Sequence, residues 1–257
     1  MFISASLDIC NIIAEYAVPK KLLDWIHQSK LYWSTLCENP EAIDLILAKT
    51  HKEVNQYKLF KYSSKPKPKL DGINWKNLSR NTAAIHLLKS NRRNIDWSIL
   101  CRNPAAIDLI EINPRKIDWC GLSMNPAAIY LLEANPDQIK WDYLSVNPAA
   151  IHLLEKNPDK IYWFWFARNP AAMHLIEANL DKINWDYLSF NPAAVHLLEA
   201  NPNKIYWPWL STNPAAIHLL EANPGRINWE HLSENPAIFE INQKEIAKLA
   251  RTLANKY

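Results

Sequence analysis

Glycine is scarce in this chain, which has three glycines among its 257 residues. Leucine-rich repeats of the strand-and-turn kind need glycine turns and β-branched strand runs. Valine is rare here as well, so that architecture is excluded. The chain also has no glycine-rich phosphate loop, nucleophile elbow or His-Glu-x-x-His zinc motif. We therefore expect a protein that is not an enzyme and that needs no cofactor.

Cysteines, net charge and long apolar runs are also sparse. The four cysteines form no Cys-x-x-Cys pair, which favours free thiols in a reducing compartment. The formal net charge of +3 is too small to indicate nucleic-acid binding by itself. No run approaches the roughly 18 apolar residues of a transmembrane helix, and the N-terminal segment lacks the basic start of a signal peptide. We expect no membrane association.

Tryptophan is abundant by contrast, and most of the 12 tryptophans recur at a fixed interval of 22 residues. The periodic tryptophans are Trp75, Trp97, Trp119, Trp141, Trp163, Trp185, Trp207 and Trp229. Sequence periods of about 20 to 50 residues are typical of solenoids, propellers and arrays. The period therefore predicts a repeat protein.

Each unit reads I-x-W-x-x-L-S-x-N-P-A-A-I-H-L-L-E-A-N-P-x-K, with small variations. Asparagine followed by proline is a helix-start signal, so Pro148–Lys156 is predicted to be a helix capped by Asn147. Asn157 precedes the next proline and ends that helix, and Trp163–Ala167 supplies a second, very short one. Helices this short are marginal alone, so neighbouring units must stabilise them. The predicted fold is an all-α solenoid of helix-turn-helix repeats.

The periodic tryptophans are interpreted as wedges between neighbouring units rather than as ligand contacts. Burying one aromatic ring removes about 150–250 Å² of surface from water. At roughly 25 cal/mol per Å² this gives about 4–6 kcal/mol before the costs of folding are counted. Tryptophan is therefore a sufficient core residue for so small a unit.

The ends of the chain are predicted to cover the exposed faces of the first and last units. The predicted segments are a helical N-terminal leader or cap at 1–30, a first repeat at 31–52, a degenerate repeat with a basic, proline-rich loop at 53–72, regular repeats at 73–236 and a C-terminal capping helix at 237–257. The leader is expected to contain two helices broken at Pro19, the second with Leu22, Leu23 and Ile26 on its apolar face.

The Asn-Pro-Ala-Ala-Ile-His-Leu-Leu-Glu motif, the 22-residue tryptophan period and the leader sequence LDICNIIAEYA together resemble the tryptophan-repeat proteins of large DNA viruses of the giant-virus kind. The resemblance covers nearly the whole chain and implies a location in the host cytoplasm or the virion. The leader at Leu7–Leu36 is also similar to an F-box, although it lacks the proline after the first leucine. An F-box would imply recruitment of a ubiquitin ligase.

Histidine occupies one fixed place in several units, a pattern that suggests a metal site at first sight. These histidines are His86, His152, His174, His196 and His218. Equivalent atoms in packed helices lie about 8–10 Å apart, whereas zinc needs ligands at about 2.0–2.1 Å from one centre. Asp44, Asp108 and Tyr130 fill the same place elsewhere. We expect no metal, and instead a surface pair between His152 and Glu155 of the same helix.

Aromatic residues at the second position after the periodic tryptophan exceed what a solenoid core needs. In four consecutive units this position holds Tyr143, Trp165, Tyr187 and Trp209, and Tyr162, Phe164 and Tyr206 accompany them. Tyrosine and tryptophan are enriched at interface hot spots. These residues are the predicted partner-binding surface, an exposed ridge for a protein; a thicker core in these units is the alternative.

Basic residues are concentrated in the first half of the chain. They comprise Arg80, Arg92, Arg93, Arg102, Arg115 and the segment Lys61–Lys69. Repeat proteins that read RNA use a polar pair in each unit, which is absent here. A solvated face or an acidic protein partner is the preferred interpretation.

The expected function is that of a non-catalytic, protein-binding scaffold of a large DNA virus, with an adaptor for a host protein as one form of it. Two alternatives stay open. One is a structural virion component of the minor capsid or core, and the other is an RNA-binding helical repeat. The oligomeric state and the partner are not determined by the sequence.

Overall fold

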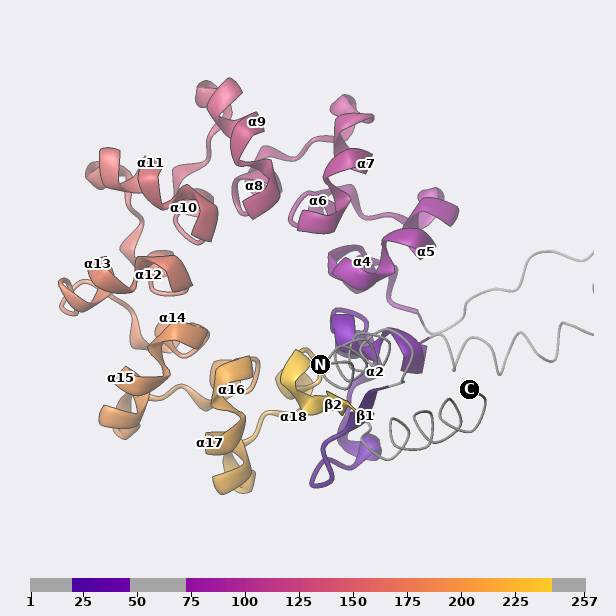
Figure 1. Cartoon of the computed structure of the whole chain (residues 1–257), viewed down its shortest axis with the longest axis vertical. Helices are drawn as coiled ribbons and strands as arrows, with labels where there is room; N and C mark the ends of the chain where they lie inside the picture. Colours follow the sequence, from indigo (N-terminus) through magenta and orange to yellow (C-terminus); the bar gives the residue numbers. More distant parts are fainter. Residues whose placement is uncertain (1–19, 47–72, 242–257) are drawn as a thin grey trace, which may run out of the picture.

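The computed structural model describes residues 20–46 and 73–241, and in it the repeat units form a closed ring (Figure 1). We number the units 1 to 9 in chain order, so that Trp33 belongs to unit 1, Trp75 to unit 2 and Trp229 to unit 9. Each complete unit has a short inner helix that begins at its tryptophan and an outer helix at the periphery of the ring. The prediction of an all-α repeat is confirmed.

The inner helices are α2 (Trp33–Leu36), α4 (Trp75–Arg80), α6 (Trp97–Leu100), α8 (Trp119–Ser123), α10 (Trp141–Leu144), α12 (Trp163–Phe166), α14 (Trp185–Leu188), α16 (Trp207–Leu210) and α18 (Trp229–Leu232). The outer helices are α5 (Ile85–Ser90), α7 (Ile107–Glu111), α9 (Ile129–Ala134), α11 (Ile151–Lys156), α13 (Met173–Glu177), α15 (Val195–Ala200) and α17 (Ile217–Ala222).

Short 3₁₀ turns connect these helices. Directly after the inner helices lie η2 (Pro40–Ala42), η4 (Thr82–Ala84), η6 (Pro104–Ala106), η8 (Pro126–Ala128), η10 (Pro148–Ala150), η12 (Pro170–Ala172), η13 (Pro192–Ala194), η15 (Pro214–Ala216) and η17 (Pro236–Ile238), the last of which leads into strand β2 (Phe239–Ile241). Elsewhere lie η1 (Gln28–Lys30), η5 (Arg92–Asn94), η7 (Pro114–Lys116), η9 (Pro136–Gln138), η11 (Pro158–Lys160), η14 (Pro202–Lys204) and η16 (Pro224–Arg226). The predicted helix at Pro148–Lys156 is thus a 3₁₀ turn followed by α11.

The asparagine before each 3₁₀ turn that follows an inner helix caps that turn, as predicted, and also joins neighbouring units, whereas the asparagines before the turns that follow outer helices, such as Asn157, form no cap bond. The side-chain oxygen of Asn147 accepts a hydrogen bond from the backbone N–H of Ala149 at 3.0 Å. Its amide nitrogen donates to the backbone oxygens of Ser123 at 2.9 Å and of Asn125 at 3.1 Å, both in the preceding unit. Asn147 is fully buried, so these bonds satisfy polar atoms that have no access to water. The same arrangement recurs around the ring.

The periodic tryptophans pack against the buried core and are themselves half-buried. In several units, the face of the indole that points away from the core is covered by a lysine or arginine side chain. This residue lies in the segment that leads to the next unit. The Lys204 amine lies 4.0 Å from the centre of the Trp185 ring, and the Arg226 guanidinium lies 5.0 Å from that of Trp207. The tryptophan therefore has a core side and a cation-covered side.

Unit 1 closes the ring by packing on unit 9 with the bonds that join other neighbouring units. The Asn39 amide donates to the backbone oxygens of Ser233 at 3.1 Å and of Asn235 at 2.9 Å. The backbone N–H of Tyr32 donates to the Ser233 hydroxyl at 2.9 Å, and the Lys30 amine lies 4.5 Å from the centre of the Trp229 ring. The array is therefore a closed ring.

Two short strands fasten the closure. Strand β1 (Lys20–Leu22) pairs in antiparallel fashion with β2 (Phe239–Ile241). The predicted leader helix over Leu22, Leu23 and Ile26 is wrong in this part, because residues 20–22 extend to donate and accept bonds across the ring junction. Residues 239–241 are likewise a strand and not the start of a capping helix. The other predicted parts of the leader and of the C-terminal cap lie outside the described residues.

Units 1 and 2 are direct neighbours in the ring although their tryptophans are 42 residues apart. The Asn81 amide donates to the backbone oxygens of Cys37 at 3.0 Å and of Asn39 at 2.9 Å, as at the other junctions. The predicted degenerate repeat and basic loop at 53–72, with Lys61–Lys69, lie outside the described residues.

Candidate functional site

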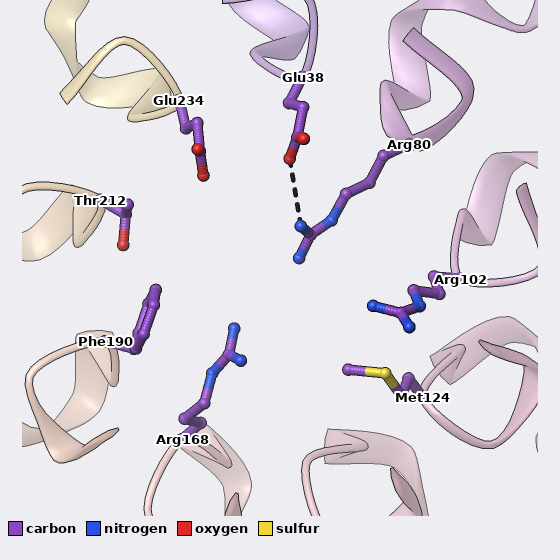
Figure 2. Close-up of a pocket in the computed structure, with 8 residues that line it drawn as sticks. All are labelled: Glu38, Arg80, Arg102, Met124, Arg168, Phe190, Thr212 and Glu234. Carbon is purple, nitrogen blue, oxygen red and sulfur yellow. Dashed lines mark hydrogen bonds and ion pairs between the residues drawn. The ribbon is translucent and has the colours of Figure 1, made fainter. Parts of the chain in front are cut away.

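The residue that precedes the capping asparagine of a unit faces the centre of the ring (Figure 2). Eight such residues line a central cavity of about 440 Å³. They are Glu38, Arg80, Arg102, Met124, Arg168, Phe190, Thr212 and Glu234. The same position in eight of the nine units therefore forms one site, and it does so only because the array closes.

The backbone of the unit aims these side chains inward. The N–H of Arg102 donates to the oxygen of Ile99 at 3.1 Å, and the N–H of Arg168 donates to that of Trp165 at 3.0 Å. Each bond closes a tight turn at the end of the inner helix. The asparagine that follows is fully buried, as Asn103 and Asn169 show, so the preceding residue is held at the inner surface.

Charge is unevenly distributed around the cavity. The two carboxylates come from units 9 and 1, which meet at the ring closure, and the guanidinium groups come from units 2, 3 and 6. Arg80 forms an ion pair with Glu38 at 3.1 Å, the one ion pair between cavity residues in the part of the chain that the structure describes (Figure 2). The Arg168 guanidinium lies 4.2 Å from the centre of the Phe190 ring.

Burial and like charges shift the ionisation of two cavity residues. Burial, followed by the nearby Arg80 and Arg102 charges, lowers the pKa of Arg168 to about 10. Burial, followed by the Glu38 carboxylate, raises the pKa of Glu234 to about 7. Both shifts favour the uncharged form of the group, because the cavity shields it from water and places it near groups of like charge.

The basic residues picked out in the sequence separate into two sets. Arg80 and Arg102 line the cavity, whereas Arg92, Arg93 and Arg115 are exposed in 3₁₀ turns that follow outer helices. Sequence reasoning missed Arg168, Glu38 and Glu234 as site residues. Their shared position before the asparagine was visible in the repeat, but its inward direction was not.

The predicted aromatic residues do come together, and Phe190, which the sequence did not single out, joins them. We call this set the aromatic band: Tyr143, Tyr162, Phe164, Trp165, Tyr187, Phe190, Tyr206 and Trp209. The ring centres of Tyr143 and Trp165 are 4.8 Å apart. Those of Tyr187 and Trp209 are 4.3 Å apart, and Phe164 lies 4.4 Å from Tyr187. The contacts cross from unit to unit, so the band spans units 5 to 8.

Exposure within the band differs from the predicted ridge. Tyr143, Trp165, Tyr187 and Trp209 are half-buried because their rings pack against one another across the unit junctions. The exposed members are Tyr162 at 46%, Phe164 at 40% and Tyr206 at 40% of their surface. The same position elsewhere also makes junction contacts. Adding a Cβ to Gly121, for example, would bring it within 2.7 Å of the Ser98 backbone oxygen.

The histidines of the outer helices pair with glutamates of the preceding unit. His152 Nε2 lies 2.9 Å from Glu133 Oε1, and His174 Nε2 lies 2.9 Å from Glu155 Oε1. The expected pair of His152 with Glu155 inside one helix is therefore wrong, because adjacent units bring the side chains closer than the helix does. Among residues 20–46 and 73–241, no group of three or more potential metal ligands gathers.

Comparison of the chain with protein-family models, with curated proteins and with solved structures found no match in any of the three. A search of the described residues also found no helix with the length and apolar character needed to span a bilayer.

Proposed function

We propose that this chain is a non-catalytic repeat scaffold of a large DNA virus, which binds a partner protein through the aromatic band and acts in the host cytoplasm or the virion. The observation that carries the proposal is the run of ring contacts over units 5 to 8 with Tyr162, Phe164 and Tyr206 exposed beside it. Aromatic anchors supported by surrounding contacts are typical of protein interface hot spots.

Acidic residues on either side of Phe164 indicate the chemistry of the partner. The position directly after the periodic tryptophan holds Asp142, Phe164 and Asp186 in units 5, 6 and 7, and all three are exposed. A segment that combines an apolar side chain with flanking lysines or arginines would complement this surface. An RNA strand would instead bring its phosphates toward two carboxylates, so the band supports a protein partner over RNA.

A selection of random displayed peptides against the immobilised protein tests this proposal. We expect enriched peptides to carry an apolar residue beside Lys or Arg. Their affinity should fall by at least about tenfold in the double variant Tyr162→Ala with Phe164→Ala, because each lost aromatic anchor is worth more than about 1 kcal/mol.

The matched control is Tyr32→Ala. Tyr32 occupies in unit 1 the position that Tyr162 occupies in unit 6, and it is 51% exposed without belonging to the band. Peptides that bind the double variant as tightly as the parent, or that are mostly acidic, would contradict the proposal.

A further inference from the structure

The central cavity holds more positive charge than its own carboxylates neutralise. Glu38 is paired with Arg80 at 3.1 Å, which leaves Arg102 and Arg168 facing Glu234. Within the described part of the chain, the Nε atom of Arg102 is buried and has no hydrogen-bond partner. That nitrogen is shielded from the cavity, but the terminal nitrogens of the Arg102 and Arg168 guanidinium groups point into it (Figure 2), where they can donate to an acceptor that arrives from outside the chain.

The remaining lining residues limit what that acceptor is. Phe190 lies against the Arg168 guanidinium and so orients its plane, and Met124 adds a second apolar side chain. A metal cation is disfavoured, because each carboxylate lies in a cavity with three guanidinium groups. Guanidinium groups bind phosphate oxygens in pairs, with a planar geometry that a single ammonium does not reproduce.

We propose that the central cavity is a binding site for a small phosphorylated molecule, whose phosphate group lies between Arg102 and Arg168. The volume of about 440 Å³ falls in the usual range of about 300–1,000 Å³ for small-molecule pockets. The units surround the cavity on all sides of the ring axis (Figure 2), which favours a compact ligand over a polymer. The proposal does not rest on partner binding by the aromatic band, although Phe190 belongs to both the cavity lining and the band.

Glu234 makes ligand binding in the cavity dependent on pH. Its carboxyl group lies near Glu38 and Arg80 and, within its own unit, near Glu230 and His231. Burial, followed by Glu38, raises its pKa to about 7, so it gains a proton readily near neutral pH. A protonated Glu234 repels the ligand less and offers an O–H donor. Measured relative to a variant that lacks this carboxyl group, binding should therefore be tighter at pH 6 than at pH 8.

Calorimetric titration of the full chain with inorganic pyrophosphate at low ionic strength tests the site. The parent protein should bind, and Arg102→Met and Arg168→Met should each weaken binding by about tenfold to a hundredfold, because each removes charge-assisted hydrogen bonds. Arg115→Met is the matched control, since Arg115 is exposed outside the cavity. Because pyrophosphate itself titrates in this range, the contribution of Glu234 is the ratio of parent to Glu234→Gln affinity, which should be larger at pH 6 than at pH 8.

The outcomes separate the proposal from its rivals. If Arg168→Met does not fold, Arg168→Lys replaces it, and it should still weaken binding because the planar pair of donors is lost. Absence of pyrophosphate binding by the parent would overturn the proposal. An equal loss in Arg115→Met would show diffuse attraction to surface charge and overturn it too. Citrate that binds as tightly as pyrophosphate would assign the cavity to carboxylates rather than phosphates.

Discussion

The junction between units 9 and 1 and the junction between units 4 and 5 use the same bonds, although only the second joins consecutive parts of the chain. Asn147 donates to backbone oxygens 24 and 22 residues earlier, at 2.9 and 3.1 Å. Asn39 donates to its two acceptors across 194 and 196 residues, at 3.1 and 2.9 Å. The junction is therefore a property of the repeat and does not depend on chain connectivity.

The two junctions differ in what reinforces them. Residues 135–140 link units 4 and 5 covalently, whereas units 9 and 1 are held by the pairing of β1 with β2 and by an ion pair between Lys21 and Glu240 at 2.9 Å. The closure also brings Glu38 and Glu234 to the same side of the cavity. A ring thus creates a charged site that an open solenoid of the same units would not have.

The largest expected effect comes from removing the joining asparagine at each junction. Asn147→Ala and Asn39→Ala should each cost about 3–6 kcal/mol of unfolding free energy, because three hydrogen bonds are lost and their buried partners stay unpaired. Denaturant unfolding of both variants measures this. A cost for Asn39→Ala below about 1 kcal/mol, with the full cost for Asn147→Ala, would show that the closure junction is not formed in solution.

The second largest loss of stability is expected from replacing a periodic tryptophan, the wedge between neighbouring units. Trp141→Ala should cost about 3–5 kcal/mol, since it removes a large ring that packs against the core of its unit. Because each unit contacts mainly its neighbours, the loss should be concentrated near unit 5, which hydrogen exchange can localise. Trp229→Ala at the closure should lower stability similarly. Thermal melts identical to the parent would contradict the wedge.

A smaller, pH-dependent effect is expected at Glu234. Its pKa of about 7 in the folded chain lies above the ordinary 4.5 of a glutamate. Below pH 4.5 the group is protonated in both folded and unfolded chains and costs nothing. As the pH rises from 4.5 to 7 the folded state loses stability, by about 1–3 kcal/mol once the partial exposure of the group is allowed for.

Glu234→Gln should therefore stabilise the protein at pH 8 and leave it unchanged at pH 4. Glu221→Gln, an exposed change in α17, serves as the control in melts at both pH values. A gain at pH 8 that is equal in both variants would mean that net charge, and not the cavity, explains it. Because Glu38 contributes to the raised pKa, an open array would also reduce the effect.

Much of the unit could be predicted from the sequence, because its signals are local. The Asn147-Pro148 pair marked a helix start, and the capping bond to Ala149 confirms it. The amide donors of the same asparagine were not predictable, since they reach the preceding unit and depend on how units pack. Closure was hidden for the same reason: a 22-residue period reports the unit and not the rotation between units.

The central cavity and the aromatic band likewise combine features that the sequence predicts with contacts that depend on how the units pack. The sequence identifies Arg80 and Arg102 as basic residues, but their position beside Arg168 in one cavity depends on the curvature of the ring. The aromatic residues were grouped correctly in units 5 to 8. Their degree of burial does not follow from the sequence, because Trp165 and Trp209 pack against rings of neighbouring units and sequence spacing does not reveal those contacts.

Ring closure is tested most directly by an engineered disulfide across it. Lys21 and Glu240 are register partners in the antiparallel pair of β1 and β2. We expect Lys21→Cys with Glu240→Cys to oxidise within one chain, as peptide mapping by mass spectrometry would show. The control, Lys21→Cys with Glu177→Cys in α13, should not. Absence of the engineered disulfide between β1 and β2 within single chains, or its formation only between chains, would contradict a closed ring.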